Sequence, residues 1–112
     1  MTNYARGASF ERDVKKDLQA NGWFVVRAAG SHGPVDLTAQ APGPIVAWIQ
    51  CKRDGKMSLV DRRALQVLSL TFHAIPVLAF KDDDGSIQYS EIVGDGYSDW
   101  NPSCEDVARG AA

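Results

Sequence analysis

Three polar residues in the middle of the chain have side chains that could support metal-assisted chemistry. Asp36 follows a glycine-rich loop, and Gln50 and Lys52 end a later apolar run, with a Pro-Gly-Pro turn between the two segments. Side chains alternate faces along a strand, so Gln50 and Lys52 would point to the same side, about 6.6 Å apart. If the two segments pair as a hairpin, Asp36 can lie beside Gln50 and Lys52. A carboxylate is a ligand for a hard cation, and an ammonium group stabilises negative charge.

These residues also have an ordinary structural explanation. Charged groups at strand ends commonly face water and carry no function. The strands alone leave both interpretations open.

The elements that must position the three residues follow from the hydrophobic pattern. It predicts a helix over 8–20, strands over 23–28, 35–39 and 45–52, a helix over 58–72, and strands over 75–80 and 87–93. Strand 23–28 is apolar on both faces, which predicts an internal position in the sheet. The order helix, three strands, helix, two strands predicts an α/β fold with a mixed central sheet flanked by helices.

Both helices carry recognisable signals. In the first, Phe10, Val14 and Leu18 recur every four residues as one apolar stripe, with Glu11 at its edge. Ser58 is the expected N-cap of the second helix, with Asp61 three residues on as a weak capping box. This second helix is apolar over more than one face, so we expect it to be covered by the sheet and by a second subunit.

Length and composition predict a single domain. We expect it to span 1–93, followed by an acidic tail over 94–112 that is partly ordered at most, with a short helix over 105–108. Within this tail, Tyr97 and Trp100 could pack onto the body or a partner. Two cysteines make neither a disulfide framework nor a zinc site. No apolar run reaches membrane length and no signal peptide is visible, so we expect a cytoplasmic protein.

The net charge of −2 hides an asymmetry along the chain. Residues 1–63 contain ten Lys and Arg against six Asp and Glu, whereas 64–112 contain two against eight. Binding to phosphates depends on a local basic face rather than on the total charge. The basic half, which also carries the polar residues described above, could therefore bind nucleic acid, or it could simply be a solvated face.

Taken together, these motifs resemble the PD-(D/E)xK restriction-endonuclease-like nucleases, and more narrowly the archaeal-type Holliday junction resolvases of archaea and some phages. The resemblance covers about residues 5–81, and its specificity comes from the order and spacing of short motifs. The matching positions are Glu11 in the first helix, Arg27 with Gly30 and Ser31 in the loop, Asp36, and Gln50 with Lys52.

The resemblance implies a fold, an activity and a set of roles. The fold would be a restriction-endonuclease-like core, and the activity metal-dependent hydrolysis of DNA phosphodiester bonds. The metal would be Mg²⁺, with Mn²⁺ as a substitute, held by Asp36, by Gln50, by the carbonyl of Cys51 and by Glu11 directly or through water. Lys52 would orient or deprotonate the attacking water or stabilise the phosphorus centre. Ser31 would help to position the scissile phosphate, although a mobile turn explains it equally well.

Gln50 departs from the family pattern, which has an acid at this position. An amide supplies one neutral oxygen in place of a charged one, so metal affinity should fall and Mn²⁺ could rescue activity. Some branches of the wider superfamily do carry glutamine there. Candidate phosphate contacts are the basic residues around the motif and one loop histidine: Arg6, Arg12, Lys15, Lys16, Arg27, His32, Arg53 and Lys56.

The expected substrate is branched double-stranded DNA, most specifically the four-way junction, cut by paired nicks from a symmetric homodimer. No membrane partner or small-molecule substrate is expected, and the source would be an archaeal or bacterial cell or a phage acting in its host. Three alternatives remain open. They are another endonuclease on the same fold (restriction-like, or specific for flaps or other branches), a catalytically inactive DNA-binding module, and a structural partner-binding domain.

Overall fold

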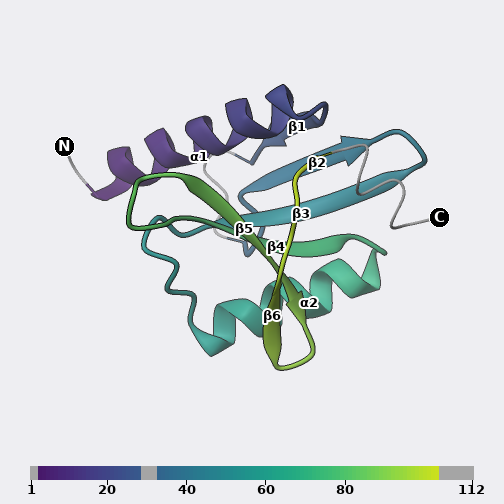
Figure 1. The fold of residues 1–112 in the computed structure, drawn as a ribbon. Coiled ribbons are helices and arrows are strands. Elements are labelled where there is room, and N and C mark those ends of the chain that lie inside the picture. Colours follow the sequence, from purple (N-terminus) through teal and green to yellow (C-terminus); the bar gives the residue numbers. More distant parts are fainter. Residues whose placement is uncertain (1–2, 29–32, 104–112) are drawn as a thin grey trace.

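The computed structural model describes residues 3–28 and 33–103, with side chains from residue 6 onward, and its centre is a six-stranded sheet in the order β1-β2-β3-β4-β5-β6 (Figure 1). The elements are α1 (Asn3–Ala20), β1 (Phe24–Arg27), β2 (Leu37–Ala41), β3 (Ile45–Cys51), α2 (Leu59–Thr71), β4 (Ile75–Lys81), β5 (Ile87–Val93) and β6 (Gly96–Asp99). No helix in the described part of the chain is long and apolar enough to cross a membrane.

The sheet is mixed, as predicted. Neighbouring strands are antiparallel except β3 and β4, which run parallel and are connected through α2. A parallel pair needs such a crossover, because a tight turn can join only antiparallel strands. The two helices cover opposite faces of the sheet (Figure 1). The α/β prediction is therefore confirmed.

The main core lies between α1 and the sheet. The predicted stripe of Phe10, Val14 and Leu18 is buried there, against Ala47 and Ile49 of β3 among others. On β3 the alternate residues face the α2 side, where the Trp48 ring lies 5.6 Å from that of Phe72. Since strand residues alternate faces, Gln50 falls on the α2 side as well.

The predicted ends of the helices are partly right. Ser58 is the N-cap of α2, and its side-chain oxygen accepts a 3.1 Å hydrogen bond from the Asp61 backbone N–H. Gly22 has a φ of 96°, which is the left-handed conformation expected just after α1. The predicted start of α1 near residue 8 is wrong, because the helix begins at Asn3.

The prediction that strand 23–28 is internal is also wrong. β1 is an edge strand, and its outward-facing Phe24 and Val26 are 66% and 50% exposed. Val25 between them is buried under α1. A run that is apolar on both faces looks like an internal strand, but here only one face meets the core.

A sixth strand was not predicted. β6 pairs with β5 through a short turn, and all four of its residues are exposed. Immediately after it, the buried Trp100 ring contacts Trp23 at 5.5 Å and Tyr89 at 5.7 Å between centroids. The Trp23 indole N–H also donates a 2.6 Å hydrogen bond to the carbonyl of Pro102. Trp100 thus packs onto the body, whereas the predicted helix over 105–108 lies outside the described residues.

We expect Trp100→Ala to lower the free energy of unfolding by about 3 kcal/mol, the usual cost of truncating a buried aromatic side chain. Tyr97→Ala is the matched control, because Tyr97 is 46% exposed and should change stability by less than about 1 kcal/mol. Urea unfolding of the three proteins measures both effects. Equal stability of Trp100→Ala and the wild type would show that the segment after β6 is not part of the folded domain.

Candidate active site

Asp36 is held at the point where β2 enters the hairpin with β3. The last pair of that ladder is Leu37 with Ile49, and one residue further the Asp36 N–H donates a 2.9 Å hydrogen bond to the Ile49 carbonyl. The Cys51 N–H in turn donates a 2.8 Å hydrogen bond to Asp36 Oδ2. The backbone of β3 therefore fixes both the main chain and the carboxylate of Asp36.

The pKa of Asp36 is raised above its ordinary value. Burial is the main cause, and the Glu11 carboxylate adds to it, whereas the Cys51 N–H, Lys52 and Arg27 act in the opposite direction. A cation bound beside Asp36 would lower this pKa, because it favours the charged carboxylate. Cation and proton therefore compete at Asp36, and cation affinity should rise with pH up to the raised pKa.

Glu11 reaches the same region from α1. Its Oε1 lies 3.2 Å from Arg27 Nε, and the two side chains are only 19% and 17% exposed. This ion pair ties α1 to the end of β1. Arg27, predicted as a phosphate contact, therefore holds Glu11 in this structure.

Gln50 lies at the end of β3, and Lys52 directly follows the strand. Gln50 is 7% exposed, and its buried Oε1 has no hydrogen-bond partner among the residues that the structure describes. Lys52 Nζ lies 3.7 Å from Asp61 Oδ2 on α2, and both side chains are partly exposed. The Lys52 backbone N–H donates a 2.9 Å hydrogen bond to the Ala79 carbonyl of β4, which fixes the point from which the side chain leaves the sheet.

One cavity of about 430 Å³ brings these groups together. It is lined by Glu11, Gly33, Pro34, Asp36, Gln50, Cys51, Lys52, Asp61 and Ala64. The predicted grouping of carboxylate, amide and ammonium is thus present as geometry. What the residues do there remains a prediction.

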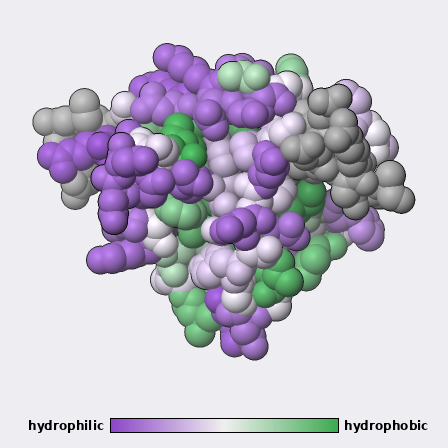
Figure 2. All heavy atoms as spheres, viewed as in Figure 1, coloured by the Kyte–Doolittle hydropathy of each residue, from purple (hydrophilic) through white to green (hydrophobic). Residues whose placement is uncertain are grey.

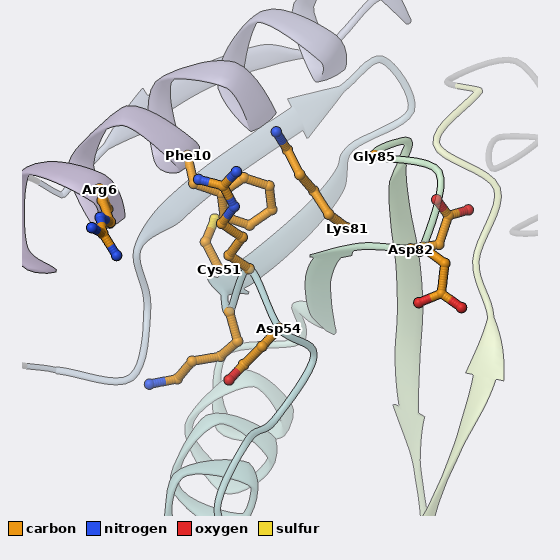
Figure 3. Close-up of a pocket in the computed structure, with 11 residues that line it drawn as sticks. Arg6, Phe10, Cys51, Asp54, Lys81, Asp82 and Gly85 are labelled. Carbon is orange, nitrogen blue, oxygen red and sulfur yellow. The ribbon is translucent and has the colours of Figure 1, made fainter.

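A second, larger cavity adjoins the first. It has a volume of about 850 Å³ and shares Cys51 and Lys52 with the smaller one. Figure 3 shows Arg6, Phe10 and Lys81 around it, and the Lys81 ammonium lies 5.9 Å from the centre of the Phe10 ring. Arg53 also lines it. Basic side chains from α1, from the segment after β3 and from β4 therefore form one surface that continues from the polar cavity.

The other predicted phosphate contacts are more dispersed. Arg12 and Lys16 are exposed on α1, Lys15 is half-buried there, and Lys56 is exposed after β3. None of these lines either of the two cavities described above. Ser31 and His32 lie outside the described residues.

Among the cavity residues that had no predicted functional role, Asp61 and Lys81 carry charges close to the predicted site. Asp61 was recognised only as part of a helix cap. Its position in the first turn of α2, the helix that follows Lys52 in the chain, was a usable signal. Lys81 ends β4 next to the segment that follows β3, where its N–H donates to the Arg53 carbonyl at 3.0 Å. Only the sheet order reveals that proximity.

The donor set fits a hard cation better than a soft one. Within residues 3–28 and 33–103, the buried Gln50 Oε1 has no hydrogen-bond partner, and Asp36 lines the same cavity. Mg²⁺ is typically held by one or two carboxylates, together with waters and phosphate oxygens. Burial raises the pKa of the Cys51 thiol well above its ordinary value, and the Asp36 and Glu11 charges add to this, which favours the protonated thiol. Within the described residues, no three His, Cys, Asp or Glu side chains lie close enough to form a complete metal cage.

Comparison with known proteins places this chain in a family. The family model of the archaeal Holliday junction resolvases (Hjc) matches residues 2–91. The chain is 38% identical over 82 residues to the crossover junction endodeoxyribonuclease Hjc of Methanocaldococcus jannaschii; the match covers 70% of this chain and 60% of that protein's length.

A solved structure agrees with this assignment at the level of the fold. The crystal structure of Archaeoglobus fulgidus Hjc, a Holliday junction resolvase from an archaeal hyperthermophile, superposes with a TM-score of 0.65 at 22% identity. The superposition covers 93% of this chain and 96% of that one. The chain belongs to the archaeal Holliday junction resolvase (Hjc) family.

Proposed function

We propose that this protein is a metal-dependent endonuclease that resolves four-way DNA junctions in the cytoplasm. The observation that carries the proposal is the single cavity that collects Glu11, Asp36, Gln50 and Lys52 in a member of the Hjc family. The curated relative bears the name of a crossover junction endodeoxyribonuclease. The substrate class is transferred from that name. The roles of the site residues are those implied by the family resemblance, and their common cavity supports them.

The proposed chemistry assigns each residue one task. Asp36 and Gln50 would hold the cation, with the carbonyl of Cys51 on the same strand, and Mg²⁺ is the expected ion with Mn²⁺ as a substitute. When bound, the cation offsets negative charge on the scissile phosphate and makes water a better nucleophile. Lys52 would orient the attacking water and donate to the phosphate oxygen on which charge develops. Glu11, kept in place by Arg27, would accept a hydrogen bond from a water at the rim.

The larger cavity gives the DNA backbone a path away from this site. Arg6, Arg53 and Lys81 line it, and Lys52 lies where it meets the polar cavity. Acidic side chains such as Asp54 and Asp82 also line it, so it is not uniformly basic. Contacts of this kind read phosphate positions and branch shape rather than base edges.

A homodimer is part of the proposal. The side of α2 that faces away from the sheet exposes Val60, Val67 and Leu70. Figure 2 shows hydrophobic residues gathered in the lower part of the molecule, where α2 and β6 lie in Figure 1. A second copy covering this face would give a two-fold assembly with two sites, which matches the symmetry of a four-way junction.

The second candidate is a DNA-binding module that no longer cleaves. The amide at Gln50 favours it, because a neutral oxygen holds a divalent cation less tightly than a carboxylate. Such a protein would bind junctions without metal and would not nick them in Mg²⁺ or Mn²⁺. Comparing junctions, flaps and linear duplexes in one cleavage assay also separates a junction resolvase from other branch-specific nucleases.

We expect Asp36→Ala and Lys52→Ala each to abolish cleavage of a four-way junction while leaving junction binding intact. Removing the carboxylate or the ammonium takes away charge stabilisation at the reacting phosphate, a loss of at least about 100-fold in rate. Cleavage assays in Mg²⁺ and Mn²⁺, with gel-shift binding in parallel, measure both properties. Normal cleavage by either variant would refute the assigned site.

Gln50→Glu should leave cleavage in Mg²⁺ intact or raise it, because it adds a charged ligand oxygen beside Asp36. The gain should be smaller in Mn²⁺ if weak cation binding limits the wild type. Cleavage rates over a range of Mg²⁺ concentrations test this. Complete loss of activity would show instead that the amide itself is required.

Val67→Glu should convert the dimer to a monomer, since it places a charge within the exposed apolar face of α2. Val26→Glu is the matched control, because Val26 is similarly exposed but lies on edge strand β1. Sedimentation equilibrium gives the mass of each protein. A wild type that is monomeric at all concentrations, or a Val67→Glu variant that stays dimeric, would exclude α2 as the interface.

A further inference from the structure

The polar cavity holds little negative charge unless Asp61 is counted. Of its other lining side chains, Asp36 and Glu11 are acidic and Lys52 is basic, and Arg27 pairs with Glu11 from outside the lining. Gln50 contributes no charge, whereas an acid at this position would leave the group negative. Asp61 restores one negative charge to the same cavity.

We propose that Asp61 supplies the negative charge that Gln50 lacks, and that it acts on the cation site through Lys52 and intervening water. This inference rests on the proposed function, and it adds a positioning residue from α2 to a site otherwise built from α1 and the β2-β3 hairpin. Asp61 lies in the first turn of α2. The α2 N-cap at Ser58 fixes the backbone from which its side chain extends.

Two observations support the proposal. The Asp61 carboxylate lies 3.7 Å from the Lys52 ammonium, so it holds this ammonium at the rim of the cavity and offsets its repulsion of a cation. Independently, Gln50 is more than nine-tenths buried and presents an oxygen with no hydrogen-bond partner among the described residues, so a cation or a water inside the cavity would satisfy it. The two residues line the same space, so a cation that satisfies Gln50 also lies within the field of Asp61.

In this arrangement Asp61 would lie outside the ligands of the cation, beside Lys52. The described Asp, Glu, His and Cys side chains do not form a group of three that could hold one ion. A carboxylate further out acts by orienting the groups and waters around the ion. Losing such a group commonly lowers metal affinity by roughly 10-fold or more.

The test measures cation binding directly, without DNA. The free Mn²⁺ signal in electron paramagnetic resonance gives the Mn²⁺ dissociation constant of the 112-residue protein. We expect Asp61→Asn to weaken Mn²⁺ binding roughly 10-fold and Asp61→Glu to retain it. Because Asp61→Asn also removes a favourable charge from the first turn of α2, thermal melting of each variant checks that it is folded. Asp61→Glu keeps that charge, so it separates the effect on the helix from the effect on the site.

Two further variants make the result specific. Asp54→Asn removes one negative charge near Lys52 while keeping an oxygen that can accept from the Lys56 N–H, so it controls for general electrostatics. We expect it to leave Mn²⁺ affinity within about 2-fold of the wild type, because Asp54, unlike Asp61, does not line the polar cavity and its charge is screened by solvent. The double variant Gln50→Glu, Asp61→Asn should recover most of the Mn²⁺ affinity that Asp61→Asn loses, because the glutamate places a negative charge on β3.

The outcomes separate this inference from the proposed function. If Asp61→Asn binds Mn²⁺ as well as the wild type while Asp36→Asn does not bind, the inference fails and the proposed metal site stands. Equal losses in Asp54→Asn and Asp61→Asn also overturn the inference. A wild type that binds no Mn²⁺ and cleaves no junction overturns both proposals.

Discussion

The structure of the site depends on one hydrogen bond, from the Cys51 N–H to the Asp36 carboxylate. It crosses from β3 to the residue before β2, next to the Asp36 N–H to Ile49 carbonyl bond that extends the ladder between the two strands. A half-buried carboxylate would otherwise lose its hydration without compensation, so the backbone donor lowers the cost of keeping it charged. The same bond fixes Asp36 relative to Gln50 and Lys52, which flank Cys51 on the strand. This backbone donor thus orients the carboxylate and partly offsets the effect of burial, which still leaves the pKa of Asp36 raised.

Around that bond, the fold balances charge with groups from separate elements. Glu11 from α1 pairs with Arg27 at the end of β1, and Lys52 pairs with Asp61 on α2. Each pair joins a helix to the sheet, so helix packing and site electrostatics are coupled. Exposed ion pairs contribute little to stability. Lys52 with Asp61 is of this kind, so its value lies in where it places the ammonium rather than in stability.

The sequence was sufficient where short-range rules decide the outcome. The Pro-Gly-Pro turn and the alternation around Gln50 predicted the β2-β3 hairpin, and Ser58 predicted the start of α2. Prediction failed where the result depends on the order of strands in the sheet. An edge position for β1, a pairing partner for β6, and the proximity of Lys81 to Arg53 are all set by long-range contacts that no local pattern encodes. Asp61 was recognised only as a capping residue. Its proximity to Lys52 results from the packing of α2 across β3 and β4, which the local sequence does not reveal.

The glutamine at position 50 is best understood from its burial. A glutamate in this place would have to be desolvated next to Asp36, and two neighbouring carboxylates raise each other's pKa. An amide avoids that repulsion but leaves its oxygen unpartnered, at a cost of about 1 to 3 kcal/mol when nothing is bound. The cost is removed when a cation or water fills the cavity, so the amide favours the occupied state even though it attracts a cation less strongly than a carboxylate does. A negative charge held outside the buried region, as on Asp61, adds attraction without placing a second carboxylate beside Asp36.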